Sequence, residues 1–235
     1  MIVGLKKRIY SLLDTIYYHI FKSNANGKLI RYVTPNLRLK EKVIIVGSSG
    51  TILDKDYKKI IDEADEVIRF NRAPVEGFEN SVGSKTTLRA ANNHVFDNVD
   101  ILKEGYSNQP KDFIKNLKNQ RILYIGSDLD PWNNRDSNAH SSCELFIFNH
   151  NKMNNFKRSL NAFSIPKQMT IGGIMVGLCV LAGIKPIMVG FDFEPKIRTH
   201  YWELRPPSPS GAHSVTEEQK WCLSLEKQNK IVILR

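Results

Sequence analysis

Two histidines near the carboxyl end of the chain have neighbours that could support acid–base chemistry. His213 directly precedes Ser214, and Glu217 follows three residues after Ser214, which is the spacing of a capping box at a helix start. The positive end of a helix disfavours protonation of a nearby imidazole, and a neutral imidazole can act as a general base near pH 7. His200 lies in the run T-H-Y-W-E. The competing interpretation is that both histidines are surface loop residues.

A turn of small residues could bind an anion. Gly47, Ser48, Ser49 and Gly50 follow the apolar run 43–46. A helix is predicted over residues 54–63 and a second strand over 66–70, so the segment reads as one βαβ unit. The carboxyl end of a parallel strand is where open α/β sheets bind ligands, and the amides of a helix start favour an anion there. The turn lacks the G-x-G-x-x-G spacing, and no G-K-[ST] follows, which excludes a P-loop.

The second predicted strand ends at Asn71, which lies between Arg69 and Arg72. NAD sites place Asp or Glu at this position to bind the ribose hydroxyls. The sequence therefore disfavours NAD. The two arginines leave NADP, or a phosphate ligand of another kind, as an open alternative.

A strongly apolar segment begins at residue 169 and is predicted to form a helix. Thr170 is at a plausible N-cap position, and Gly172 follows two residues later. The predicted strand 186–189 comes next and ends at Gly190, Phe191 and Asp192. The helix start suits an anionic group. The alternative is a buried helix whose glycines only permit close packing, and both interpretations can hold together.

These residues are carried by alternating strands and helices. The alternation predicts an α/β fold, with a single Rossmann-like domain and a mostly parallel central sheet flanked by helices. A length of 235 residues with 41% hydrophobic and 25% charged residues fits one sizeable core. The remaining strands are predicted over residues 87–91, 121–126 and 231–234.

Four blocks of the sequence resemble the motifs of the animal-type sialyltransferases. The runs V-G-S-S-G-T-I-L and R-F-N-R-A-P-V-E-G-F-E-N-S-V-G-S-K-T-T resemble the family's large sialylmotif. The runs M-T-I-G-G-I-M, T-H-Y-W-E and H-S-V-T-E-E follow in the order of its other motifs. The blocks lie between residues 43 and 218. The resemblance implies the GT-A-like variant of the Rossmann fold for a catalytic domain over residues 41–235.

The resemblance also implies an activity. It is that of an inverting, metal-independent glycosyltransferase, which moves an ulosonic acid such as sialic acid from a CMP-sugar donor to a glycan hydroxyl. His213 would be the general base, His200 would stabilise charge on the leaving phosphate, and Glu218 would orient the helix or His213. The donor-binding residues that it implies are Gly47, Ser48, Ser49, Gly50, Asn71, Asn92, Thr170, Gly172, Gly190, Phe191 and Asp192.

Several of these roles are specific. The helix start at Thr170 and Gly172 would hold the sugar carboxylate, while Phe191 and Asp192 would line the nucleoside pocket. Ser48 replaces an asparagine of the family, which removes that side-chain contact. Asn92 could contact the donor or could form an Asx turn as the chain leaves its strand. Residues 127–165 are polar and are predicted to form acceptor-side or surface loops.

No cofactor is implied, because the CMP-sugar is a substrate. Asp128 and Asp130 form a D-x-D pair of the kind that holds a divalent ion against a diphosphate. A CMP-sugar has one phosphate, so a loop rich in Asp and Asn is the favoured interpretation, and no metal site is predicted. A CMP-Kdo-dependent Kdo transferase is the closest alternative function. A non-catalytic nucleotide-binding module and an NADP-dependent reductase are more distant ones.

Residues 1–40 form a basic amphipathic segment. Nine Lys or Arg and two acidic residues in the first 42 give a net +7 of the chain's +10. The apolar stripe from Leu5 to Ile20 is either a helix packed on the domain or, within residues 1–22, an interfacial helix on an anionic membrane. A transmembrane span and a cleavable signal peptide are disfavoured. No motif supports nucleic-acid binding. The predicted partners are the donor and a glycan or glycolipid acceptor.

The sequence lacks the two cysteines that, in the animal enzymes, form the disulfide between the large and small sialylmotifs. Lys42 or Val43 stands at one expected cysteine position, and residues 182–183 stand at the other. Cys143, Cys179 and Cys222 have no metal-site or redox spacing. We therefore predict a reducing compartment, the cytoplasm of a bacterium, with possible peripheral contact at the inner face of its membrane.

Overall fold

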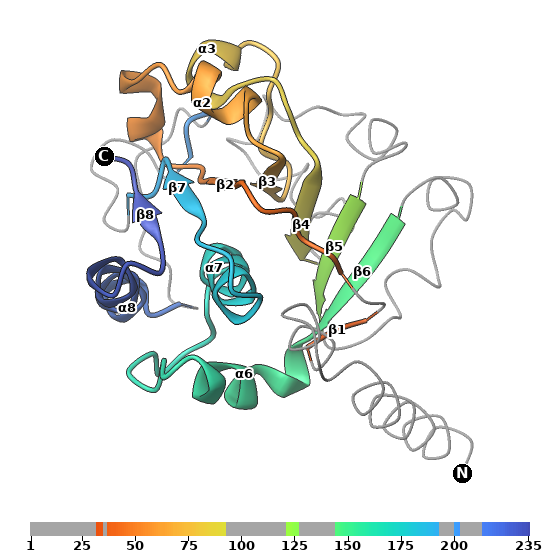
Figure 1. Ribbon diagram of the computed structural model, residues 1–235, viewed down its shortest axis with the longest axis vertical. Coiled ribbons are helices and arrows are strands. Elements are labelled where there is room, and N and C mark those ends of the chain that lie inside the picture. The colour runs from red at the N-terminus through yellow and green to blue at the C-terminus, as the bar shows by residue number, and fades with distance from the viewer. Residues whose placement is uncertain (1–31, 35–36, 93–120, 127–143, 193–199, 203–212) are drawn as a thin grey trace, which may run out of the picture.

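A single sheet organises the chain in the computed structural model, which describes residues 32–34, 37–92, 121–126, 144–192, 200–202 and 213–235. Its strand order is β1-β6-β5-β4-β3-β2-β7-β8 (Figure 1). Strand β1 pairs antiparallel with β6, and all other neighbours in this sheet are parallel. The predicted α/β class is confirmed. The strands are β1 (Val33–Thr34), β2 (Val43–Val46), β3 (Glu66–Phe70), β4 (Leu88–Asn92), β5 (Arg121–Gly126), β6 (Glu144–Asn149), β7 (Ile187–Val189) and β8 (Val232–Ile233).

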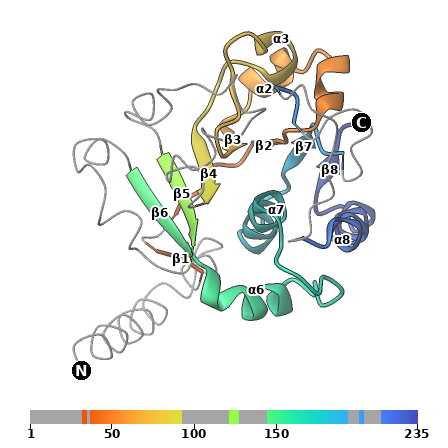
Figure 2. The ribbon, with the colours of Figure 1, turned by 180° about the vertical axis from the view of Figure 1, so that it is seen from behind.

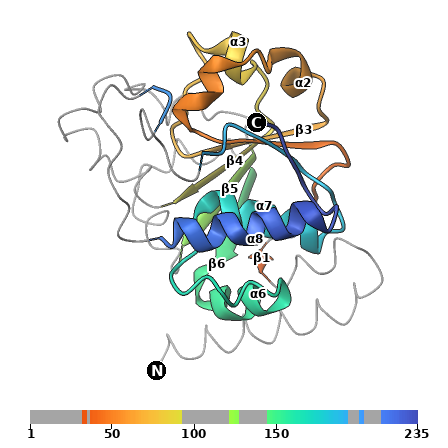
Figure 3. The ribbon, with the colours of Figure 1, turned by 90° about the vertical axis from the view of Figure 1, so that its left-hand side faces the viewer.

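Helices cover both faces of the sheet, so its central strands are apolar on both sides. Ile44 and Val67 pack toward one layer, and Ile45 and Ile68 pack toward the other. Figures 2 and 3 show α2 and α3 on one side of the sheet and α6, α7 and α8 on the other. The helices are η2 (Gly50–Asp54), α2 (Lys58–Asp62), α3 (Glu79–Val82), η6 (His150–Lys152), α6 (Met153–Ser159), α7 (Ile171–Leu181) and α8 (Val215–Lys227).

The order of the strands reverses at β2. From β2 the chain builds β3, β4, β5 and β6 in one direction, and it then returns to place β7 and β8 on the other side of β2. The carboxyl ends of β2 and β7 therefore form the topological switch point of the sheet. Open α/β sheets bind ligands in the crevice at such a point.

The helix predicted over residues 54–63 is shorter than expected. A 3₁₀ helix, η2, follows the glycine turn directly, and α2 begins only at Lys58. The Asp56 side chain accepts a hydrogen bond from the Lys58 amide at 3.1 Å, so the side chain competes with a continuous helix and starts a new one. The strands predicted over 87–91 and 231–234 are also shifted or shortened, to Leu88–Asn92 and Val232–Ile233.

Strand β6 and helix α6 lie within residues 127–165, where only loops were predicted. That prediction is wrong for residues 144–159. Phe148 and Phe156 are fully buried, and their rings meet edge-on at 5.1 Å. Strand β1 and the buried Leu37 belong to the same core, although the sequence assigned both to the amino-terminal segment.

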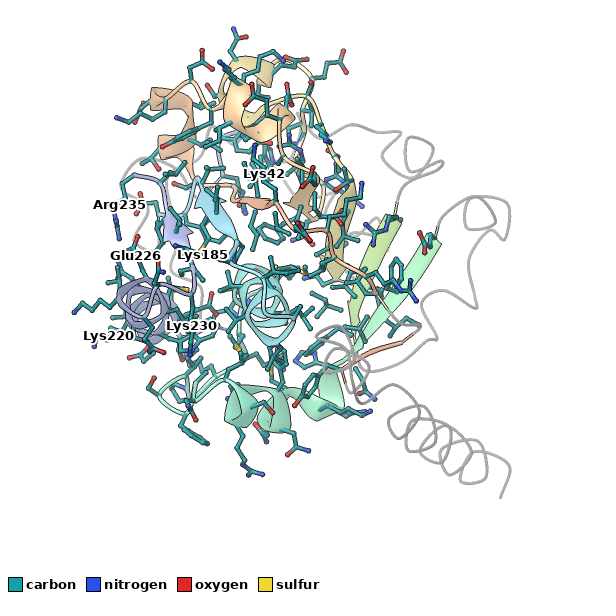
Figure 4. The ribbon with its side chains drawn as sticks, viewed as in Figure 1. Lys42, Lys185, Lys220, Glu226, Lys230 and Arg235 are labelled. Atoms are coloured by element: carbon teal, nitrogen blue, oxygen red, sulfur yellow. The ribbon has the colours of Figure 1, made fainter. Side chains whose placement is uncertain are left out.

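The β8 edge of the sheet is held by contacts from α8. Arg235 pairs with Glu226 at 2.6 Å, and Glu226 also accepts a hydrogen bond from the Ile233 amide at 3.1 Å. Figure 4 shows Glu226 and Arg235 at this end of the molecule. Charged side chains along an edge strand oppose pairing with another chain.

Two of the three cysteines lie in the described part of the chain. Cys179 and Cys222 are buried free thiols, and burial raises the pKa of both. A buried thiol of raised pKa is a poor nucleophile, so these residues act as core side chains. Among the described helices, none has both the length and the apolarity that a membrane crossing requires. Residues 1–22, Asp128, Asp130 and Cys143 lie outside the described residues.

Candidate active site

The glycine turn after β2 is fastened to the end of β7. The Gly47 amide donates to the Val189 carbonyl at 2.8 Å, and the Ser49 amide donates to the Gly190 carbonyl at 3.1 Å. A Cβ atom on Gly47 would lie 2.2 Å from the Gly190 oxygen, so only glycine fits there. Gly190 has a φ of +68°, a conformation that glycine adopts without cost. Backbone hydrogen bonds thus join the carboxyl ends of β2 and β7 at the switch point.

Two of the four amides of this turn, those of Gly47 and Ser49, already have protein partners. The Ser49 side chain accepts from the Thr51 amide at 3.3 Å and caps η2. Among the described residues, the Ser48 and Gly50 amides are the ones in the turn for which the structure shows no partner. The anion site expected at the start of a long helix is therefore reduced to these two amides, because η2 spans only five residues.

Two asparagines meet where β3 and β4 end. Asn71 has a φ of +44°, and its side-chain oxygen accepts from the Asn92 amide at 3.3 Å. The Asn71 carbonyl accepts from the Arg89 guanidinium at 2.8 Å, which fixes the turn. The Asn92 side-chain oxygen is buried and has no hydrogen-bond partner among the described residues. The structure thus brings together these two residues, both of which were predicted to bind the sugar donor. The Asn92 side-chain oxygen is the acceptor that is left open among the described residues.

The Phe191 ring lies between the ends of the strands and the start of α7. It packs edge-on against Phe70, with ring centroids 6.1 Å apart. Added Cβ atoms on Gly47 or Gly172 would each lie 2.9 Å from this ring. Residues from three separate segments of the sequence therefore converge on one aromatic side chain.

The start of α7 binds a carboxylate of the protein itself. Thr170 caps the helix by accepting from the Gly173 amide at 3.0 Å. Its own amide donates to Glu218 at 2.8 Å, and its hydroxyl donates to the same carboxylate. Glu218 thus lies at the helix start that was predicted for the sugar carboxylate. Among the described residues, the Ile171 and Gly172 amides of this first turn have no partner and can still face a ligand.

Burial raises the pKa of the Glu218 carboxyl, and the hydrogen bonds from Thr170 and the charge of His213 oppose this rise. A carboxyl whose pKa is higher in the folded than in the unfolded protein contributes stability at pH values below its unfolded pKa of 4.5. This contribution is lost as the pH rises through the pKa of the folded protein. We expect the stability of Glu218→Gln, which cannot ionise, to rise relative to that of wild type as the pH increases above about 4.5. Where the wild-type carboxyl is ionised, the variant also lacks one of the two bonds from Thr170, which offsets about 1 kcal/mol of this gain.

Denaturant unfolding of both proteins at several pH values measures this difference. Glu217→Gln is the matched control, because Glu217 lies beside Glu218 in α8 and is only half-buried. A stability difference between wild type and Glu218→Gln that does not change with pH would contradict the expectation.

His213 is held by the segment that leads into α7. Its Nδ1 atom lies 3.1 Å from the Gln168 carbonyl oxygen. A carbonyl can only accept, so Nδ1 carries a proton in this contact, and in the neutral ring Nε2 keeps its lone pair. Ser214 is the N-cap of α8 as predicted, but its side chain accepts from the Lys167 amide at 3.3 Å instead of completing the capping box. The same segment is therefore bonded to both residues.

His200 is positioned by the glycine turn, whereas His213 is held by the segment before α7. The amide of the next residue, Tyr201, donates to the Ser48 carbonyl at 2.8 Å. The His200 ring stacks on Trp202 with centroids 4.7 Å apart. Tyr201 is fully buried and donates to the Pro74 carbonyl, which anchors the segment. The two predicted catalytic histidines are thus anchored on different elements.

The arginines that suggested NADP are not available to a ligand. Arg69 is fully buried and donates to the carbonyls of Val82 at 2.6 Å and Gly83 at 3.1 Å. Burial lowers the pKa of Arg69 to about 10. Arg72 is 4% exposed. Both side chains are buried beside β3, so neither guanidinium is exposed to a phosphate.

His150 was missed by the sequence analysis. It follows β6 directly, and its Nε2 atom is buried without a hydrogen-bond partner in the described structure. The four apolar residues 145–148 were a sequence signal for the strand that places it. Near the two histidines and Glu218, no three described His, Cys, Asp or Glu residues are arranged to hold a metal ion.

A mostly parallel sheet with polar groups gathered at its switch point defines a nucleotide-binding α/β protein. The model of the family described as "Glycosyltransferase family 29 (sialyltransferase)" matches residues 7–230. The chain belongs to this family, which confirms the resemblance found in the motifs.

Individual relatives match over shorter stretches. The chain is 56% identical over 48 residues to a CMP-N-acetylneuraminate-beta-1,4-galactoside alpha-2,3-sialyltransferase of Mus musculus, and this match covers 20% of the chain and 13% of the relative. It is 44% identical over 54 residues to human beta-galactoside alpha-2,6-sialyltransferase 2, covering 23% of the chain and 10% of the relative. The matches thus span a small part of these relatives.

Solved structures share the whole fold. A mammalian sialyltransferase crystallised with Gal-beta-1-3GalNAc-ortho-nitrophenol aligns with a TM-score of 0.59 and 21% identity, over 94% of this chain and 85% of that one. A second crystal structure of a mammalian sialyltransferase aligns with a TM-score of 0.61 and 20% identity. At this identity the comparison establishes the fold.

Proposed function

We propose that the protein transfers sialic acid from CMP-sialic acid to a hydroxyl group of a galactose-containing glycan. The donor is supported by membership of the sialyltransferase family, and the acceptor class by the galactosides in the names of its relatives. The observation that carries the mechanism is the contact between His213 Nδ1 and the Gln168 carbonyl, which leaves Nε2 unprotonated next to the start of α7.

In this mechanism His213 Nε2 takes the proton of the acceptor hydroxyl as its oxygen attacks the anomeric carbon. The new carbon–oxygen bond forms on the face opposite the leaving group, and the bond to the phosphate oxygen breaks, so the configuration inverts. The electron pair of the broken bond leaves with CMP. The Ser48 and Gly50 amides, Asn71 and His200 stabilise the charge that develops on the phosphate.

The sugar and the nucleoside have separate contacts in this proposal. The Ile171 and Gly172 amides at the start of α7 face the sugar carboxylate, whose charge suits the positive end of an eleven-residue helix. The buried Asn92 oxygen accepts a hydrogen bond from the nucleoside, and Phe191 and Asp192 line its pocket. Glu218 acts through Thr170 by fixing the helix start.

The reaction uses no metal in this proposal, because a single phosphate can be stabilised by amides and imidazole. The cytoplasmic location and the membrane contact of residues 1–22 stay predictions.

CMP release by the purified protein tests the donor and the chemistry. We expect release from CMP-sialic acid in the presence of a β-galactoside, with CMP-Kdo as the comparison donor and EDTA added to a parallel sample. The expected result is release from CMP-sialic acid that EDTA does not reduce. Release from CMP-Kdo alone would replace the donor in this proposal. Failure to bind CMP would overturn the proposal entirely.

A further inference from the structure

His150 has a rigid backbone at the carboxyl edge of the sheet. The preceding residue, Asn149, donates its amide to the Tyr32 carbonyl at 3.0 Å, and its side chain caps η6 by accepting from the Asn151 amide at 3.0 Å. Met153, in the following turn, is buried in the core. Fixed neighbours on both sides hold the backbone from which the imidazole projects, which is part of what a binding group requires.

The side chain presents a buried polar atom for which the described part of the chain provides no hydrogen-bond partner. Nε2 of His150 is buried and has no hydrogen-bond partner among the described residues. Buried polar groups in folded proteins are nearly always paired, and an unpaired one calls for an explanation such as a ligand that completes the bond. A bound substrate group would satisfy this atom.

His150 also lies within electrostatic reach of His213. Burial lowers the pKa of His150, and a positive charge on His213, when that ring is protonated, lowers it further. The imidazole of His150 is thus kept neutral, with one nitrogen that donates and one that accepts. A sugar hydroxyl both donates and accepts, so it matches a neutral imidazole better than a phosphate or a carboxylate does.

The sheet order indicates which substrate this hydroxyl belongs to. The groups assigned to the donor follow β2, β3, β4 and β7, whereas β6 lies two strands beyond β4. The proposed base, His213, must face the acceptor hydroxyl, and His150, which directly follows β6, is near enough for a charge on His213 to act on it. We propose that His150 is an acceptor-binding residue, whose Nε2 atom hydrogen-bonds a hydroxyl of the acceptor sugar next to the one that reacts.

This inference rests on the proposed function, and steady-state kinetics with CMP-sialic acid and a β-galactoside tests it. His150→Phe keeps a planar ring and removes both nitrogens, and His150→Gln restores a polar group near the position of Nε2. We expect His150→Phe to raise the acceptor KM about tenfold and to leave the CMP-sialic acid KM within about twofold, since one neutral hydrogen bond is lost. His150→Gln should recover most of the loss.

Two controls separate binding from folding. Asn154→Ala changes an exposed polar residue on the neighbouring helix α6 and should keep both KM values. Monodeoxy β-galactosides locate the contact: removal of the bonded hydroxyl should raise KM about tenfold for wild type and cause no further rise in His150→Phe. If His150→Phe does not fold, His150→Leu takes its place in the same comparison.

The outcomes are distinct. An acceptor KM that is unchanged in the folded apolar variant overturns the role of His150, as does an equal rise in both KM values. Wild-type protein that binds CMP but transfers nothing to any β-galactoside overturns the proposed function, and the acceptor role of His150 with it.

Discussion

Replacing His213 with alanine is expected to lower the rate of sialyl transfer by about 10²–10⁴-fold, which is the usual contribution of a positioned general base. The Gln168 carbonyl holds Nδ1 at 3.1 Å and directs the lone pair of Nε2 away from the backbone. Alanine has no group that can take the acceptor proton. CMP affinity should stay within about twofold, because the base does not hold the nucleotide.

Initial rates of CMP release and a CMP binding titration measure the two quantities separately. Thr216→Ala is the matched control, since Thr216 is exposed in the first turn of α8, the helix that follows His213. This variant should keep the wild-type rate. A His213→Ala protein that transfers sialic acid at the wild-type rate would show that the base lies elsewhere. Loss of CMP binding in that variant would assign His213 to the donor site instead.

The second large effect is expected from Gly47→Ala. The added methyl group would lie 2.2 Å from the Gly190 oxygen and 2.8 Å from the Gly190 carbonyl carbon. These are backbone atoms of a parallel strand pair and cannot turn away as a flexible side chain can. We expect a loss of about 3 kcal/mol in the free energy of unfolding, at the upper end of the usual cost of overpacking.

The same substitution should weaken CMP binding by at least about tenfold, because separating β2 from β7 moves the Ser48 and Gly50 amides. Gly77→Ala is the matched control, since no atom lies within 4 Å of its added Cβ. Its φ of +83° costs about 1 kcal/mol for any residue with a side chain, and CMP affinity should not change. Wild-type CMP affinity in Gly47→Ala would contradict the role given to the turn.

Local patterns in the sequence were enough to predict the class of fold. The run of β-branched residues before the glycine turn predicts β2, and the pair of strands around residues 54–63 predicts a parallel unit. The start of α7 at Thr170 and the start of α8 after Ser214 were also predicted correctly. Each of these features depends on residues a few positions apart, so the chain itself displays them.

The errors occur where a side chain has a choice of partners. Ser214 was expected to bond within its own helix, yet it accepts from Lys167, 47 residues away. Arg69 left a phosphate ligand as an open alternative, yet its side chain donates to carbonyls of the 82–85 segment. Strand β6 was missed because the polar residues around it suggested loops, and its pairing with β5 is what stabilises it.

The sequence by itself therefore determined the βαβ unit, the starts of α7 and α8 and most of the groups that could do chemistry, because these follow from local periodicity and capping. Only the tertiary structure decided which of these groups meet. Glu218 reaches Thr170 across 48 residues, and Asn92 reaches Asn71 across 21. Asn92 and Asn71 meet because parallel strands bring their carboxyl ends to one edge of the sheet, whereas Thr170 and Glu218 meet because the starts of α7 and α8 pack against each other. Neither contact, nor the burial of the His150 Nε2 atom, leaves a periodic trace in the chain.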